Sequence, residues 1–271
     1  MLNLLIWSKD RACQLDLLLQ SLPAGLFNLA YVVYKTSTKE YQDGYCKLLD
    51  QNFDTNLELK PETDFQKDTT EFIRHTANAG NMLCVSTDDT VFFADCPISS
   101  ERICNLLEDK RTATFSFRYG FNTIVQNCHN GEIQPHLDYH EDEGDHIVWN
   151  SLHYHPLSNY GYPFGLDAHC YDPELLLSLL YCRKFNNTNQ LETTLFDSRM
   201  EAPKLIRSLY QSIAVNIPAN NMSGITISGD REEFSLEELN KRYLEGFRIS
   251  LDVIKQNRFV GCHQEAELCL V

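Results

Sequence analysis

Two adjacent carboxylates, Asp88 and Asp89, interrupt an apolar stretch and limit the fold of this chain more than any other feature. Apolar runs at residues 82–85 and 91–94 flank them. A buried strand that ends in acids and restarts at once places two negative charges at the carboxyl edge of a sheet, where open α/β sheets bind ligands. Unpaired neighbouring carboxylates resist burial, so they indicate a counter-cation, most simply Mg²⁺ or Mn²⁺ shared with substrate phosphates. A solvated Asp-Asp-Thr turn fits the pattern equally well.

The composition is typical of one large globular domain. The 271 residues can bury a full core, and 43% of them are hydrophobic. The net charge of −15 argues against nucleic acid and anionic membranes as partners, although a nucleotide remains compatible if a metal and local basic groups offset the charge. Ten cysteines without a Cys-x-x-Cys pair, and no long apolar run, predict reduced thiols, a cytoplasmic location, no signal peptide and no membrane span.

The first half of the chain alternates predicted strands and helices. Strands are expected at 2–7, 29–34 and 57–59 and before Asp88, and helices are expected at 15–22, 38–50 and 62–79. This β-α-β-α-β-α-β order predicts a parallel sheet with helices on both faces. The turn Ser8-Lys9-Asp10-Arg11 leads into the first helix, whose N-terminus is a natural anion site that Lys9 and Arg11 would reinforce. Simple capping of that helix by Ser8 or Asp10 is the alternative.

The second half is less regular. A helix is expected at 99–109, a strand at 113–118 that ends in Arg118, and a strand at 147–149. Asp172 and Pro173 predict a helix start, and a capping box at Ser235 predicts another helix that ends near Gly246. Further segments are predicted as helices at 191–200 and 204–210, an extended piece at 213–216, and an Asn-, Ser- and Gly-rich mobile loop at 219–231 that orders over a bound nucleotide.

Two polar and aromatic stretches are ambiguous. Residues 128–146 contain four histidines and several acids, which fits a metal-binding loop but is more typical of a solvated loop. Histidines and aromatic residues cluster at 153–164, which suits the flat face of a sugar ring and would equally serve ordinary packing.

Four places make the chain similar to nucleotide-sugar glycosyltransferases of the GT-A fold, in particular family-two-like enzymes. The Ser8–Arg11 turn resembles the first-strand turn that receives the nucleotide, and Thr87-Asp88-Asp89 resembles an Asp-x-Asp-type motif whose acids are adjacent. Asp167 resembles the base of inverting members, and His263 lies where some members supply a further metal or diphosphate contact. The resemblance implies an α/β fold with a Rossmann-like mixed sheet, in one GT-A-like domain with a nucleotide-binding half (1–96) and an acceptor-binding half (97–271).

The resemblance also implies a function, a metal-dependent and inverting sugar transfer from a UDP- or GDP-linked donor to a glycan or other hydroxyl acceptor. It implies these roles: Mg²⁺ or Mn²⁺ on Asp89 with His263 nearby, a ribose or sugar contact at Asp88, donor contacts at Ser8, Lys9, Asp10, Arg11 and Arg118, base stacking on Tyr34, and a general base at Asp167 or, second, Glu192.

Two other functions remain open. A nucleotidyltransferase would share the fold and the metal, but it normally carries a glycine-rich phosphate loop, and residues 8–14 contain no glycine. A non-catalytic protein that binds a sugar or a nucleotide would keep the fold without the chemistry.

Overall fold

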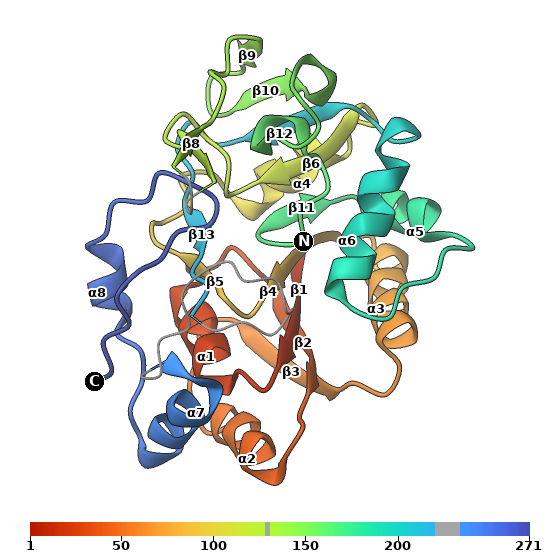
Figure 1. Ribbon diagram of the computed structural model, residues 1–271. Coiled ribbons are helices and arrows are strands. Elements are labelled where there is room, and N and C mark those ends of the chain that lie inside the picture. The colour runs from red at the N-terminus through yellow and green to blue at the C-terminus, as the bar shows by residue number, and fades with distance from the viewer. Residues whose placement is uncertain (128–130, 220–233) are drawn as a thin grey trace.

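The computed structural model describes residues 1–127, 131–219 and 234–271. Within these residues a nine-stranded mixed sheet forms the centre of the molecule (Figure 1). Its strands, from one edge to the other, are β3 (Asn56–Pro61), β2 (Leu29–Lys35), β1 (Leu2–Lys9), β4 (Met82–Thr87), β11 (His169–Tyr171), β6 (Thr112–Ser116), β12 (Leu205–Ser208), β10 (Ile147–Asn150) and β9 (His140–Asp142).

The predicted parallel arrangement of the first half is confirmed. Strands β3, β2, β1 and β4 are parallel neighbours. Strand β11 then runs antiparallel between β4 and β6, and β12 returns parallel to β6. Strand β1 is buried along almost its whole length, because helices cover both faces of a parallel sheet.

Two layers of helices enclose the sheet. One core cluster lies between the sheet and α1 (Ala12–Ser21), α2 (Lys39–Leu48), α4 (Ser100–Leu107), α7 (Leu236–Glu245) and α8 (Leu251–Lys255). A second lies on the opposite face, against α3 (Phe65–Asn78), α5 (Pro173–Leu180) and α6 (Thr188–Asp197). Within the described residues, no helix has the length and apolar character needed to cross a membrane.

Local capping chemistry sets several of these helix ends as predicted. Asp172 Oδ1 accepts a hydrogen bond from the backbone N–H of Glu174 at 2.9 Å, with Pro173 at the first helical position of α5. Ser235 caps α7, which ends at Gly246 with a left-handed φ of 111°. Both predicted helix starts are confirmed.

Small hairpins and turns lie around the main sheet. Strand β5 (Thr90–Phe92) follows β4 after a two-residue turn formed by Asp88 and Asp89, and it pairs antiparallel with β13 (Ala214–Asn216). The remaining short elements are β7 (Val125–Asn127), β8 (Glu132–Ile133) and the 3₁₀ helices η1 (Ser151–His153), η2 (Asn159–Gly161) and η3 (Ser198–Met200).

The predicted helix at 204–210 is wrong. This segment contains strand β12, which lies between β6 and β10. Three of its four residues are buried, including Arg207, so no polar face marks it as a strand, and a short apolar run does not separate strand from helix by periodicity alone. The predicted loop at 219–231 lies outside the described residues from residue 220 onward.

Candidate functional site

The carboxyl ends of β1 and β4 meet at a topological switch point. The chain runs from β1 outward to β2 and β3 and then returns to β4 on the other side of β1. Loops that leave two such strands diverge and open a crevice at the sheet edge, where α/β proteins bind ligands. The turn after β1 carries Ser8 to Arg11, and the turn after β4 carries Asp88 and Asp89. The two sequence patterns singled out in the first half therefore lie together.

Arg11 supplies a counter-cation for the two adjacent carboxylates. Its Nη1 lies 3.2 Å from Asp88 Oδ1 and 3.5 Å from Asp89 Oδ2. Ser8 Oγ donates to Asp88 Oδ2 at 2.8 Å, and the Lys9 backbone N–H donates to the same oxygen at 3.3 Å. The Asp88 side chain is 5% exposed and that of Asp89 19%. Burial raises the pKa of Asp88 to about 6, although Arg11 opposes that shift.

Asp10 has a structural place in the first turn. It takes a left-handed φ of 58°, and its Oδ1 accepts a hydrogen bond from the Ser37 backbone N–H at 2.7 Å. The N-cap of α1 is Arg11, whose side chain makes no capping hydrogen bond, and the Arg11 backbone N–H donates to the Tyr45 hydroxyl at 3.2 Å. The alternative that Ser8 or Asp10 merely caps α1 is therefore wrong.

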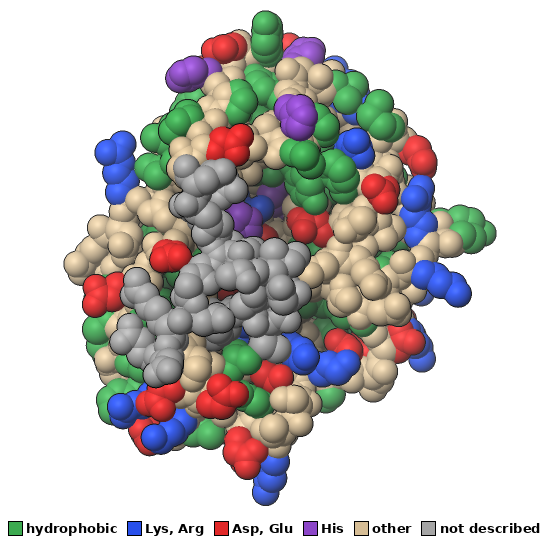
Figure 2. Space-filling view, in the orientation of Figure 1, with side chains coloured by type: hydrophobic (Ala, Val, Ile, Leu, Met, Phe, Trp, Pro, Cys, Tyr) green, Lys and Arg blue, Asp and Glu red, His purple; other side chains and the backbone are tan. Residues whose placement is uncertain are grey.

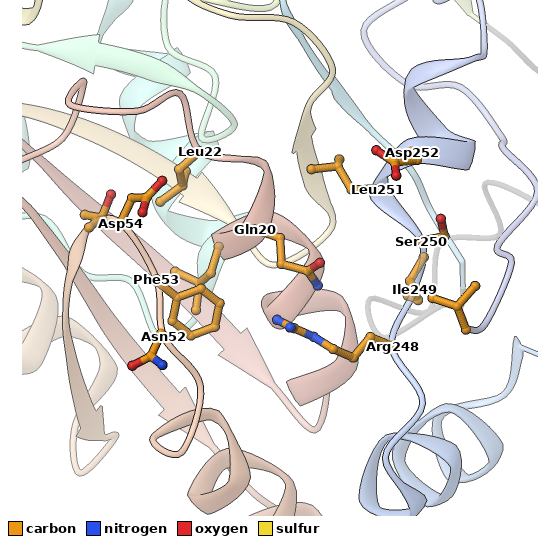
Figure 3. A pocket seen from close by; sticks show the side chains of 13 residues that line it. Gln20, Leu22, Asn52, Phe53, Asp54, Arg248, Ile249, Ser250, Leu251 and Asp252 are labelled. Atoms are coloured by element: carbon orange, nitrogen blue, oxygen red, sulfur yellow. The ribbon is translucent and has the colours of Figure 1, made fainter.

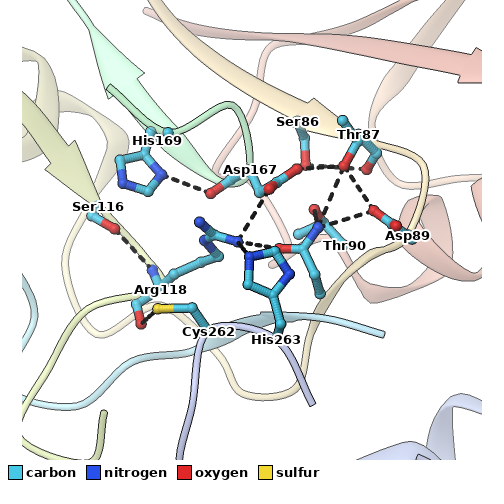
Figure 4. Close-up of polar contacts among 12 residues, drawn as sticks. Ser86, Thr87, Asp89, Thr90, Ser116, Arg118, Asp167, His169, Cys262 and His263 are labelled. Carbon is cyan, nitrogen blue, oxygen red and sulfur yellow. Dashed lines mark hydrogen bonds and ion pairs between the residues drawn. The ribbon is translucent and has the colours of Figure 1, made fainter. Parts of the chain in front are cut away.

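A second polar group lies beside the first (Figure 4). Arg118 Nη1 is 3.1 Å from Asp167 Oδ2 and 3.4 Å from His263 Nε2, and it also donates to Asn216 Oδ1. Thr87 Oγ1 contacts Asp167 Oδ1. Strand β13 and the C-terminal segment together bring His263 here, because Asn216 pairs with His263 in a parallel bridge.

Thr87 and Asn216 join the two groups into one network. Thr87 Oγ1 lies 2.7 Å from Asp89 Oδ1, and Asn216 Nδ2 donates to that same oxygen at 2.9 Å. The carboxylates of Asp88, Asp89 and Asp167, which come from two distant segments, are thus linked through two neutral side chains and two arginines. No motif in the sequence singles out Asn216, which only ends a short extended segment, whereas Thr87 lies within the predicted acidic motif.

Asp167 lies two residues before β11, next to a residue with a left-handed backbone conformation. The following residue, Ala168, has a left-handed φ of 52°. His169 is fully buried, and its Nδ1 lies 2.7 Å from the Asp167 carbonyl oxygen. Burial would raise the pKa of Asp167, but Arg118, His263 and the Thr87 hydroxyl outweigh burial and bring it below its usual value.

Glu192 is the acid in this region whose pKa lies near neutrality. It projects from α6 and is partly exposed. Burial and the neighbouring charge of Asp167 raise its pKa to about 7, while Arg118 and hydrogen bonds from Leu166 and Tyr162 oppose the rise. Tyr162, which the sequence reading assigned only to an aromatic cluster, is therefore a neighbour of the second candidate base.

Tyr34 lies at the end of β2 and is 7% exposed. Its ring stacks on Tyr45 with centroids 4.5 Å apart, and its hydroxyl accepts from Gln42 Nε2 at 3.0 Å. One face of the ring proposed to stack on a base is thus covered by Tyr45. Tyr45 in turn hydrogen-bonds the Ser8 hydroxyl and so helps to hold the turn after β1 in place.

The donor set of the site decides what kind of metal centre it fits. Among the described residues, no group of three or more His, Cys, Asp or Glu side chains is arranged to hold a metal ion. Asp89 is more exposed than Asp88, although Thr87 and Asn216 contact its Oδ1 and Arg11 lies near its Oδ2. Mg²⁺ commonly uses one or two carboxylates and completes its shell with water and substrate phosphates. The residues therefore fit a metal that arrives with a phosphorylated substrate, rather than an all-protein metal centre.

The described surface is hollowed near the middle of the view in Figure 2, where acidic, basic and histidine side chains are visible together. A separate cavity of about 510 Å³ lies between the end of α1, the loop at residues 52–55 and residues 248–252 (Figure 3). Arg248 in that cavity is paired with the buried Asp16 through bonds of 2.8 and 2.6 Å. This cavity contains none of the site residues described above.

Comparison with known proteins adds no family, since no family model and no curated protein matches the chain.

Proposed function

We propose that this chain is a metal-dependent glycosyltransferase of the GT-A fold that moves a sugar from a nucleotide-diphosphate donor to an acceptor hydroxyl. The observation that carries the proposal is the convergence, at the β1/β4 switch point, of carboxylates from three segments with two arginines. Such a site offers positive charge for a diphosphate, carboxylates for sugar hydroxyls and a metal, and an acid with a pKa near neutrality. Residues 1–96 would form the donor half and residues 97–271 the acceptor half.

The donor is held mainly by the first turn and the acidic hairpin. Lys9, Arg11 and the N-terminus of α1 face the diphosphate, where the helix dipole favours negative charge. Asp88 accepts hydrogen bonds from donor hydroxyls. Asp89, with His263 as a further contact, would hold Mg²⁺ or Mn²⁺, which would supply positive charge to the departing diphosphate. Arg118 adds a fixed positive charge beside the donor sugar.

Glu192 is the better general base of the two candidates. Asp167 is paired with Arg118 and its pKa is lowered, so it accepts a proton poorly at neutral pH. The pKa of about 7 at Glu192 suits proton transfer under those conditions. The acceptor oxygen gives its proton to Glu192 and forms a bond to the anomeric carbon, as the bond from that carbon to the diphosphate breaks. One such displacement inverts the configuration, while Asp167 positions Arg118.

The glycine-free first turn makes transfer of a nucleotidyl group the weaker alternative. Asp10, not glycine, takes the left-handed conformation in this turn. Its carboxylate adds negative charge at the place where a glycine-rich loop would present backbone N–H groups to phosphates.

Calorimetry with UDP and GDP, each with and without Mn²⁺, tests the proposal. We expect Mn²⁺ to strengthen the binding of one nucleotide, and Asp89→Asn to weaken the binding with Mn²⁺ by at least tenfold. Asp95→Asn, at an exposed acid beyond the same hairpin, is the matched control and should bind like the wild type. Failure of both nucleotides to bind with Mn²⁺ would contradict the proposal.

A further inference from the structure

Six exposed or half-exposed rings form an aromatic surface beyond the candidate site. Phe121 packs edge-on against His140 with centroids 5.1 Å apart and stacks on Tyr210 at 6.2 Å. Tyr139 contacts His153 at 5.5 Å and Tyr154 at 6.5 Å. Tyr139 and His140 are consecutive in the chain, so the backbone joins the two ring groups. We call these six residues the aromatic surface: Phe121, Tyr139, His140, His153, Tyr154 and Tyr210.

The aromatic surface is open to solvent but firmly supported. Phe121 is 41% and Tyr139 66% exposed. The Tyr154 hydroxyl accepts a hydrogen bond from the Tyr139 backbone N–H at 3.0 Å, and the Tyr154 ring packs on the buried Tyr160. In Figure 2, hydrophobic and histidine side chains gather over the end of the molecule that carries β9 and β10 in Figure 1. Contiguous exposed apolar patches of this kind often mark interaction sites, whereas single exposed rings do not.

The aromatic surface is tied to the candidate site through the backbone between Arg118 and Phe121. Phe121 follows Arg118 by three residues, and its backbone N–H donates to the Tyr210 carbonyl at 2.8 Å. A Cβ on Gly120 would lie 2.4 Å from the Ser212 backbone nitrogen, so the chain is pressed against its neighbour between Arg118 and Phe121. The arginine and the first ring are therefore fixed relative to each other.

The charges around the aromatic surface exclude anionic ligands. Residues 121–157 contain no lysine or arginine, while they carry six acids and six histidines. Two arginines that border the segment are already paired, Arg102 with Asp145 and Arg207 with Asp109. Rings that stack on apolar faces, beside carboxylates and imidazoles that accept hydrogen bonds from hydroxyls, match an uncharged polyhydroxyl chain.

We propose that the aromatic surface binds a neutral oligosaccharide, whose end reaches the candidate site as the acceptor. This inference rests on the proposed function for the acceptor role, but the binding itself does not require transfer. Several sugar units would lie across the two ring groups, with one pyranose face on Tyr139 and another on Phe121. Acceptors of one sugar unit would then bind weakly, because they reach one ring group at most.

The test is binding of wild-type protein to a panel of neutral oligosaccharides (oligomers of glucose, galactose and N-acetylglucosamine), with heparin fragments and a basic peptide as charged comparators. Saturation-transfer NMR identifies a bound member, and titration gives its affinity. We expect at least one neutral oligomer to bind, Tyr139→Ala to weaken it tenfold or more, and Tyr139→Phe, which keeps the ring, to retain it. Tyr181→Ala, at a 79% exposed tyrosine after α5, is the matched surface control.

Donor binding separates this inference from the proposed function. UDP or GDP affinity in the presence of Mn²⁺ should be the same in Tyr139→Ala and wild type, which also shows that the variant is folded. Oligosaccharide binding without any nucleotide binding would overturn the proposed function and keep this inference. Binding of the peptide or heparin alone, of no oligosaccharide, or equal binding by Tyr139→Ala would overturn this inference.

Discussion

At the scale of single residues, the site separates its acids by their environments. Asp167, paired with Arg118, has a lowered pKa; Asp88, buried and paired with Arg11, has a pKa of about 6; Glu192, half-buried beside Asp167, has a pKa of about 7. Acids whose environments move their pKa values apart are suited to different roles. The neighbouring charge of Asp167 contributes to the raised pKa of Glu192. Removing the Asp167 carboxylate should therefore lower the pKa of Glu192.

Glu192→Gln should therefore change both catalysis and stability with pH. The proposed base Glu192 accepts a proton only when it is deprotonated, so the wild-type turnover rate should rise with pH through about 7. Glu192→Gln should lower that rate by roughly two to four orders of magnitude. The raised pKa means that ionisation costs the folded state stability between pH 4.5 and about 7. The Tm of Glu192→Gln should thus match that of the wild type near pH 4 and exceed it at pH 8. A Tm gain independent of pH would contradict this reasoning; Glu174→Gln, at an exposed acid, is the control.

Arg11 should be essential for stability, because its guanidinium neutralises two carboxylates that are largely removed from solvent. Arg11→Met keeps much of the volume but leaves Asp88 without its ion pair, and breaking a buried pair on one side typically costs about 3–5 kcal/mol. Denaturant unfolding should show a loss of this order. The double variant Arg11→Met/Asp88→Asn should recover a large part of it, since the buried charge is gone. If the double variant lost as much stability as Arg11→Met and Asp88→Asn lose in sum, the ion pair would contribute nothing to stability.

At the scale of elements, the segment that leads into β11 contains two positions where exchanging alanine and glycine should have opposite effects on stability. Ala168 adopts a left-handed φ of 52°, which glycine reaches without strain, so Ala168→Gly should stabilise the fold by up to about 1 kcal/mol. A Cβ on Gly165 would lie 2.8 Å from the buried His169 ring, so Gly165→Ala should destabilise it. Thermal unfolding of both variants checks the two signs. Equal destabilisation by both would mean that the backbone at Ala168 is not strained.

Elements with strong local signals could be predicted from the sequence, and elements defined by distant partners could not. Asp172 with Pro173, and Ser235 with Gly246, mark their helices within a few residues and are confirmed. Strand β12 was mistaken for a helix because its strand character comes from its neighbours β6 and β10. Burial on both sides removes the alternation that would reveal such a strand.

At the scale of the whole molecule, the site also combines features that local sequence patterns predict with contacts that depend on distant segments. The sequence placed Arg11, Asp88 and Asp89 near one sheet edge, because the carboxyl ends of all strands in a parallel sheet lie at the same edge. It did not predict that Arg11 pairs with both acids, nor that Asn216 links Asp89 to the Arg118–Asp167 pair. The Asn216 contacts depend on β13 pairing with β5 across more than a hundred residues, which no local pattern encodes.

The net charge of −15 leads to a prediction about how the donor arrives. A nucleotide-diphosphate sugar carries negative charge on each phosphate, so the field of the whole protein repels it at long range, whereas the arginines attract it only within the site. Salt shortens the Debye length from about 30 Å at 0.01 M to about 8 Å at 0.15 M and should weaken the repulsion first. In metal-free buffer, the association rate of the bound nucleotide, measured by stopped flow, should therefore rise with salt over this range. With saturating Mn²⁺ the metal offsets the phosphate charge, and the same rate should depend only weakly on salt. A metal-free association rate that falls with salt would show that local basic groups, not the overall charge, govern the approach.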